Sequence, residues 1–248
     1  MAATKRAEVP PLMQMASHPV RWALLAELAG GDHRVRELAD AVDEPQNLVS
    51  YHLRLLRSAG LIDARRSNFD ARDTYYHLNL ARCAAEFAGA ASALHPALAP
   101  AATTRPAGSV LFLCSGNSAR SPMAEALLRK KGGGRIRAAS AGSHPKPQMH
   151  PNAVRIMRDL YGIDLGGGRP QPLAAVARGR FDCVITLCDK VREYAREHGV
   201  VTAMHWSLPD PSAAEGRASY PEFRRVASEL NDRIDFLLPV LAQPRERR

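Results

Sequence analysis

The chain has 248 residues, enough for one large domain or two small ones, and a hydrophobic fraction of 46% is ordinary for a globular protein with two cores. Its net charge of +9 is unevenly spread: residues 1–107 carry 12 basic and 11 acidic side chains, whereas residues 108–248 carry 22 and 14. Charge alone therefore gives poor support for nucleic-acid binding by the first half, and that case depends on the residue pattern.

Secretion and membrane insertion are not expected. Lys5 and Arg6 are followed by the stretch EVPP instead of an apolar signal core. An Ala-rich run at 84–102 is broken by one glutamate, one histidine and two prolines, which favours a helix and a linker over a membrane span. The cysteines lack both a secreted context and a paired metal spacing, so we expect a cytoplasmic protein with reduced thiols and no metal site. They are Cys83, Cys114, Cys183 and Cys188.

Three helices are predicted at the start of the chain. Ser17 can cap the first, from His18 to Ala29, and Gly30 follows its end. The apolar stripe of this helix is Trp22, Leu25 and Leu28. A short helix at 35–41 and a longer one at 46–59 follow, separated by an Asp-Glu-Pro turn. Helix, short turn and helix is the arrangement that lets the second helix enter a major groove.

Two strands, 61–64 and 74–78, are predicted after the third helix, and a polar stretch joins them. Together these elements predict a winged helix-turn-helix domain, mostly α-helical with a two-stranded wing. An Ala-rich helix at 81–94 should then help to pair two subunits, because its small residues permit close packing.

The run NLVSYHLRLLRSAGLI, residues 47–62, resembles the ArsR family of dimeric bacterial repressors, and the likeness extends over about residues 11–80. It implies a homodimer that binds a double-stranded DNA operator. The candidate base and phosphate contacts are Gln46, Asn47, Ser50, Tyr51 and Arg54, with Arg65 and Arg66 at the wing. The alternative is a three-helix domain whose polar face meets water or a partner protein.

Many ArsR repressors sense arsenite or a metal through paired cysteines on the helix before the recognition helix. The corresponding stretch here, 35–42, has none, and the single Cys83 further on is expected to pack in the core. The sequence therefore does not indicate what releases this domain from DNA. Residues 96–107, rich in proline and alanine, predict a linker, which divides the chain into domains at 1–95 and 108–248.

The second half alternates strands and helices. Strands are predicted at 110–113, 135–139 and 181–188, with a turn at 140–142. The helices are predicted at 123–130, 151–161, 189–197 and 221–241. This alternation predicts an α/β domain with a doubly wound parallel sheet, whose site lies where the strands end.

The stretch VLFLCSGNSARSPMAE, residues 110–125, carries the most specific chemical signal. Five residues separate Cys114 from Arg120 at a strand–loop–helix junction, where amide groups and a helix N-terminus favour an anion. Arg120 can add a bidentate fork to a tetrahedral oxyanion. The same field should lower the pKa of Cys114 and make it a thiolate nucleophile, with Ser121 as a hydrogen-bond donor to the sulfur.

This loop resembles the active-site loop of the low-molecular-weight protein tyrosine phosphatases and of the arsenate reductases built on the same fold, a likeness that covers about residues 108–240. The residues that match the pattern are Cys114, Asn117, Arg120 and Ser121. The implied oxyanion-binding loop for arsenate or phosphate is Ser115, Gly116, Asn117, Ser118, Ala119, Arg120 and Ser121.

The same resemblance assigns roles to two residues outside the loop. The aspartate of Asp210-Pro211 corresponds to the general acid, although Ser212 and Ala213 stand where the phosphatases usually carry aromatic residues. Cys188 corresponds to the cysteine that attacks the cysteine–arsenic adduct in the reductases. Thioredoxin-coupled reductases carry a further cysteine seven residues later, where this chain has Ala195.

We therefore expect a bifunctional protein, a regulator of an arsenic-resistance operon fused to an arsenate reductase. No cofactor should be tightly bound, and the reductant is an external thiol: mycothiol, glutathione with glutaredoxin, or thioredoxin. The missing cysteine favours a small thiol or a glutaredoxin-like partner over thioredoxin alone. Two alternatives remain open: a DNA-binding phosphatase, and a regulator that senses an oxyanion or thiol signal without turnover.

Overall fold

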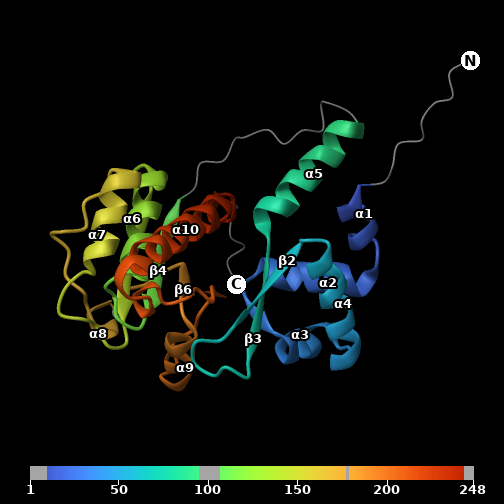
Figure 1. Ribbon diagram of the computed structural model, residues 1–248, viewed down its shortest axis with the longest axis horizontal. Coiled ribbons are helices and arrows are strands. Elements are labelled where there is room, and N and C mark those ends of the chain that lie inside the picture. The colour runs from blue at the N-terminus through green and yellow to red at the C-terminus, as the bar shows by residue number, and fades with distance from the viewer. Residues whose placement is uncertain (1–9, 95–106, 177–178, 243–248) are drawn as a thin grey trace, which may run out of the picture. The chain divides into compact units, whose positions relative to one another are not determined.

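The computed structural model describes residues 10–94, 107–176 and 179–242 (Figure 1). The chain divides into two compact units: unit 1 contains residues 1–66 and 73–102, and unit 2 contains residues 67–72 and 103–248. Nearly all of the predicted linker, 96–107, lies outside the described residues. Within the described ranges, no helix combines the length and the apolar composition needed to cross a bilayer.

Unit 1 contains helices and a small antiparallel sheet in which β3 lies between β1 and β2. Its elements are α1 (Pro11–Ala16), α2 (Pro19–Ala29), β1 (His33–Arg34), α3 (Val35–Val42), α4 (Gln46–Ser58), β2 (Ile62–Arg66), β3 (Thr74–Leu78) and α5 (Leu80–Leu94). The winged helix-turn-helix prediction is confirmed, with one more strand in the sheet than expected. The two-residue β1 was missed because a pair of residues carries no alternation pattern.

The core of unit 1 consists mainly of leucines from α2, α3 and α4. Buried members include Leu24, Leu28, Leu38, Leu53 and Leu56. Cys83 of α5 packs in the same core, as predicted, and it is 7% exposed. These apolar contacts hold α4 against α2 and α3, so the polar residues of α4 remain on its outer side.

The beginning of unit 1 corrects two predictions. Ser17 does not cap α2, because its Oγ donates to the carbonyl of Gln14 at the end of α1, a helix that the sequence pattern did not predict. Trp22 is 54% exposed. It misses the buried face because, at roughly 100° per residue, it lies about 140° around the helix from the direction shared by Leu24 and Leu28.

Unit 2 has a parallel four-stranded sheet in the order β5-β4-β6-β7. Its elements are β4 (Gly108–Cys114), α6 (Arg120–Gly132), β5 (Ile136–Gly142), α7 (Pro151–Tyr161), α8 (Leu173–Val176), β6 (Cys183–Thr186), α9 (Asp189–Glu197), β7 (Met204–His205), the 3-10 helices η2 (Pro211–Ala213) and η3 (Gly216–Ala218), and α10 (Ser219–Ala242). Helices α6, α7 and α10 pack together, with α6 against β4 and β5 (Figure 1). The predicted α/β fold is confirmed.

Two boundaries in unit 2 differ from the predictions. The stretch Ser140-Ala141-Gly142, expected as a turn, forms the last part of β5, because its backbone continues the parallel pairing as far as Cys114 opposite Gly142. Strand β6 is shorter than predicted and ends at Thr186, so Cys188 is the N-cap of α9. Since β4 and β6 pair side by side with Leu113 opposite Thr186, Cys114 and Cys188 follow the same edge of the sheet.

Candidate active site

The Cys114 sulfur lies inside the loop that joins β4 to α6. Its Sγ is 3.0 Å from Ser121 Oγ and accepts a hydrogen bond from the amide of Asn117 at 3.3 Å. The residue is only 2% exposed. The sulfur therefore lies at the N-terminus of α6, where unsatisfied amide groups and the helix dipole favour a negative charge.

Asn117 holds this loop in a conformation that few residues adopt. Its φ of 45° is in the left-handed region, where asparagine is enriched among residues other than glycine. Its side chain is buried and fully used: Nδ2 donates to Ser121 Oγ at 2.9 Å and to Ser140 Oγ at 2.8 Å, and Oδ1 accepts from the amide of Gln171 at 2.7 Å. These three bonds fix the strained backbone beside the sulfur.

The loop also packs closely against the end of β5. A Cβ on Gly142 would lie 2.7 Å from the carbonyl oxygen of Ser115, so only glycine fits there. Three loop carbonyls, of Ser115, Gly116 and Ser118, accept hydrogen bonds from the amides of His144, Lys146 and His150 at 2.8, 2.9 and 2.8 Å. Because these carbonyls accept hydrogen bonds from residues outside the loop, they point away from its interior, and the N–H groups of the loop can bind an oxyanion.

Arg120 and Asp210 are joined in this structure. The guanidinium of Arg120 is 5% exposed, and it donates to the carbonyl of Leu208 and to Asp210 Oδ2, each at 3.1 Å. The other oxygen of Asp210 accepts hydrogen bonds from the amide and the hydroxyl of Ser212. Burial raises the pKa of Asp210, but Arg120 and Ser212 outweigh it, and the net pKa lies below the ordinary value. Asp210 is therefore ionised at neutral pH.

The pKa of Cys114 differs from the sequence expectation. Burial raises it, Arg120 opposes the rise, and the nearby Cys188 adds to it, so that the pKa lies above the ordinary value of about 8.5. The hydrogen bond from Ser121 acts in the lowering direction but is smaller. The physical reason is burial, which cuts the sulfur off from water and outweighs the favourable charge of Arg120.

Cys188 lies against the same loop. Its Sγ is 3.3 Å from the Oγ of Ser115, the residue that follows Cys114, and it is 4% exposed. Cys183 is buried in the core at the start of β6, as predicted. The structure thus brings the four residues predicted for chemistry, Cys114, Arg120, Cys188 and Asp210, to one edge of the sheet.

A buried polar set beside Cys188 was not predicted. It consists of Thr186, Asp189, His205 and Ser207. Burial raises the pKa of Asp189, but hydrogen bonds from His205, Ser207 and Ser67, the last in the 67–72 segment of unit 2, hold it at about 2. The available signal was an acidic residue directly after Cys188; its partners were not visible because β7 is too short to predict.

The predicted DNA-contacting residues lie on α4 and β2 of unit 1. Gln46, Asn47, Tyr51 and Arg54 are exposed, and Ser50 is half-buried. At the wing, Arg66 is exposed and Arg65 is half-buried. His52, on the opposite side of α4, is buried, with its ring 4.5 Å from that of His18.

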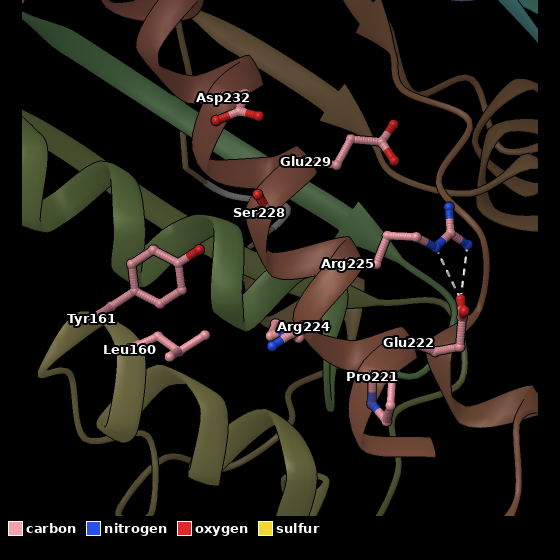
Figure 2. Close-up of a pocket in the computed structure, with 9 residues that line it drawn as sticks. All are labelled: Leu160, Tyr161, Pro221, Glu222, Arg224, Arg225, Ser228, Glu229 and Asp232. Carbon is pink, nitrogen blue, oxygen red and sulfur yellow. Dashed lines mark hydrogen bonds and ion pairs between the residues drawn. The ribbon is translucent and has the colours of Figure 1, made fainter. Parts of the chain in front are cut away.

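A separate pocket of about 760 Å³ lies between α7 and the first half of α10 (Figure 2). Its lining includes Leu160 and Tyr161 from α7, and Arg225 on α10 forms an ion pair with Glu222 at 2.8 Å. None of the predicted site residues lines it. The candidate chemistry therefore belongs to the Cys114 loop and not to this pocket.

Two family profiles match the chain. The profile described as low molecular weight phosphotyrosine protein phosphatase matches residues 109–247, and a helix-turn-helix domain profile matches residues 16–65. The first match covers unit 2 from β4 onward, including the Cys114 loop, Cys188 and Asp210. The second covers α2, α3 and α4.

Curated relatives and solved structures resemble the second half. An arsenate reductase of Brevibacillus brevis is 37% identical over 128 residues, which is 50% of this chain and 90% of the relative. One of Bacillus licheniformis is 36% identical over 50% of this chain and 91% of its own length. Among structures, an arsenate reductase in a phosphate-binding state is 29% identical with a TM-score of 0.45, covering 54% of this chain and 98% of its own. A tyrosine phosphatase of T. tengcongensis is 24% identical with a TM-score of 0.46, covering 54% and 99%.

Proposed function

The chain belongs to the low molecular weight phosphotyrosine protein phosphatase family, and on that premise we propose that unit 2 is a thiol-dependent arsenate reductase. We also propose that the helix-turn-helix unit fused to it binds the operator of an arsenic-resistance operon. The curated relatives named as arsenate reductases, each covered over nine-tenths of its length or more, support the first assignment.

The reaction begins at Cys114. Arsenate binds to the loop amides and to Arg120, which turns from Asp210 to the anion. The Cys114 thiolate attacks arsenic, and the oxygen that leaves takes a proton and departs as water. That proton comes from the Cys114 thiol: the Asp210 carboxylate, released from its ion pair, takes it as the thiolate forms and then passes it to the leaving oxygen as the general acid.

Reduction needs a second thiolate. Cys188 attacks the sulfur of Cys114, a disulfide forms between the two cysteines, and the sulfur–arsenic bond breaks with its electron pair left on arsenic. Arsenic(V) thereby becomes arsenic(III) and leaves as arsenite, while the two thiols supply both electrons. External thiols then restore the two cysteines by two exchange steps.

The observation that carries this proposal is the contact of Cys188 Sγ with Ser115 Oγ at 3.3 Å, beside the nucleophile. A phosphatase needs no second thiol, because water hydrolyses its phosphocysteine. One observation suits the phosphatase alternative as well as the reductase: Asp210 lies at Arg120, where it can act as the acid in ester cleavage. A regulator that senses an oxyanion or a thiol signal without turnover uses the same loop.

We propose a small thiol or a glutaredoxin-like protein as the reductant. Ala195 is fully buried in a regular α9, and both Cys114 and Cys188 are buried. A disulfide between the two therefore stays within the loop, and no third cysteine carries it outward to a protein of thioredoxin's size. All four cysteines carry thiols and not disulfides, in keeping with a protein that works in the cytoplasm.

For unit 1 we propose a homodimer that places two copies of α4 in successive major grooves of an inverted-repeat operator. The contacts come from Gln46, Asn47, Ser50, Tyr51 and Arg54, with Arg65 and Arg66 on the backbone. The exposed polar side of α4 supports this role.

The deciding experiment gives purified protein arsenate with each of mycothiol, glutathione with glutaredoxin, and thioredoxin with its reductase, and measures arsenite. p-Nitrophenyl phosphate hydrolysis is measured in parallel. Arsenite release with a small thiol supports the reductase. Ester hydrolysis without arsenite release supports the phosphatase, and binding of oxyanion without either product supports the sensor.

A further inference from the structure

A residue on each side of Cys188, Thr186 before it and Asp189 after it, contacts the ring of His205. His205 Nδ1 lies 2.9 Å from Thr186 Oγ1, two residues before Cys188, and Nε2 lies 3.2 Å from Asp189 Oδ1, directly after it. Ser207 Oγ donates to the same carboxylate oxygen at 2.7 Å. All four of these polar residues are buried. Since the ionised carboxylate only accepts hydrogen bonds, the His205 Nε2 carries a proton.

Backbone hydrogen bonds hold the same residues together. His205 pairs with Thr186 between β6 and β7, and the amide of Trp206 donates to the carbonyl of Thr186 at 2.8 Å. On the other side of the turn, the amide of Leu187 donates to the carbonyl of Leu113 in β4 at 2.7 Å. The turn that carries Cys188 is thus fastened to β7 and to β4.

A helix-capping role does not account for Asp189. Although it is the first residue of α9, its carboxylate accepts hydrogen bonds from His205 and Ser207 instead of from the amides of the following turn. The other carboxylate oxygen, Oδ2, accepts hydrogen bonds from Ser67 Oγ at 2.7 Å and from the amide of Asn68 at 3.0 Å. A buried carboxylate is costly unless it is paired, and the two bonds to Oδ1, from His205 and Ser207, are the ones that join the turn at Cys188 to β7 and the residues after it.

From this geometry we propose that Asp189 and His205 are positioning residues, which hold the Cys188 thiol against Ser115 so that it attacks the Cys114 sulfur. Neither residue touches the oxyanion or a reacting atom. The inference rests on the proposed function, because it concerns the step in which Cys188 forms the disulfide and arsenite leaves. Misplacement by about 1 Å is enough to slow a reaction of positioned groups about 100-fold.

The test compares two activities of the full-length protein carrying Asp189→Asn or His205→Gln. p-Nitrophenyl phosphate hydrolysis depends on Cys114, Arg120 and Asp210 but not on Cys188. Disulfide formation between Cys114 and Cys188 depends on the position of Cys188, and it can be driven by diamide without arsenate. The matched control is Asp182→Asn, since Asp182 accepts hydrogen bonds from the amide and hydroxyl of Ser109 at the opposite end of the same strand pair.

We expect both variants to form the diamide-driven disulfide and to release arsenite at least tenfold more slowly than wild type. The rate of ester hydrolysis should stay within threefold of the wild-type rate, and the thermal unfolding midpoint within a few degrees of the wild-type midpoint. Asp182→Asn should match wild type in every measurement. A general loss of packing would slow both activities together, so equal losses overturn the proposal. So does an unchanged disulfide rate.

Two further outcomes are separated by the design. Should Asp189→Asn fail to fold, Ser207→Ala removes one hydrogen bond to the same carboxylate, and an unchanged disulfide rate in that variant overturns the proposal. If wild type releases no arsenite, the proposed reductase function fails, yet the diamide rates still decide whether Asp189 and His205 position Cys188.

Discussion

The buried guanidinium of Arg120 forms an ion pair with the carboxylate of Asp210 at 3.1 Å, although the two residues lie 90 positions apart in the chain. In the proposed reaction an incoming oxyanion binds the same guanidinium, so its binding exchanges one negative partner of Arg120 for another. The exchange frees Asp210 to act on the leaving oxygen.

Removal of the Asp210 charge should therefore activate the thiol while it slows the chemistry. In Asp210→Asn, Arg120 loses its ion-pair partner, and the pKa of Cys114 should fall. Iodoacetamide labelling of Cys114 against pH, followed by mass spectrometry, should show a midpoint shifted to lower pH. Ester hydrolysis should drop about 10²-fold or more because the general acid is gone. Asp235→Asn, which removes a surface ion pair with Lys131, should change neither. An unchanged or raised midpoint would contradict the account.

Replacement of the nucleophile should separate the two halves of the protein. We expect Cys114→Ser to lose arsenate reduction and ester hydrolysis by several powers of ten, since a hydroxyl at this position is not a competent nucleophile. Operator binding should stay at the wild-type level because unit 1 has its own core. Retained arsenate reduction in this variant would refute the proposed chemistry.

Operator binding should depend on the exposed side of α4. Arg54→Ala should weaken binding about tenfold or more and reduce its salt dependence if the contact is to phosphate. Arg57→Ala, a change of the same kind in the last turn of α4, should have a smaller effect. Fluorescence anisotropy with an inverted-repeat duplex at several salt concentrations measures the affinity of each variant and the salt dependence of that affinity. Equal, sequence-independent binding by all three proteins would favour the non-DNA alternative.

The stability of unit 1 should fall with acidification. Burial lowers the pKa of His52, and the charges of His18 and Arg21 lower it further. The folded state therefore binds fewer protons than the unfolded state, in which the pKa is about 6.5, so stability is full above that value and declines as the pH drops below it. Thermal unfolding of the full chain between pH 7.5 and 5 should show this decline. His52→Leu should flatten it, and His198→Gln, an exposed histidine of unit 2, should not.

The choice of reductant should follow from the missing third cysteine. We expect wild type to recycle with a small thiol or glutaredoxin and to recycle poorly with thioredoxin and thioredoxin reductase alone. Ala195→Cys restores a thiol at that position of α9 and provides the matched gain-of-function variant. Efficient recycling of wild type by thioredoxin, with no small thiol present, would prove this expectation wrong.

The sequence predicted most of what local patterns can encode. The Cys114 loop, the α4 helix and the strand–helix alternation all depend on residues close together in the chain, and the structure contains each of them. The features that the sequence did not predict depend on contacts between residues far apart in the chain. The Asp189–His205 pair joins α9 to a two-residue strand, and Trp22 is exposed because α2 turns Leu24 and Leu28 toward the core. The direction of the Cys114 pKa depends on how completely the folded chain buries the sulfur, which no local pattern indicates.

The central claim is that Cys114 and Cys188 together supply the two electrons that reduce arsenate. The most direct measurement is a single turnover: fully reduced protein with one equivalent of arsenate and no external thiol, followed by acid quench, alkylation and peptide mass spectrometry. The account predicts one equivalent of arsenite and a Cys114–Cys188 disulfide, with neither product from Cys188→Ser. Arsenite formation by Cys188→Ser at the wild-type rate, or wild-type protein with both thiols still alkylatable, would contradict it.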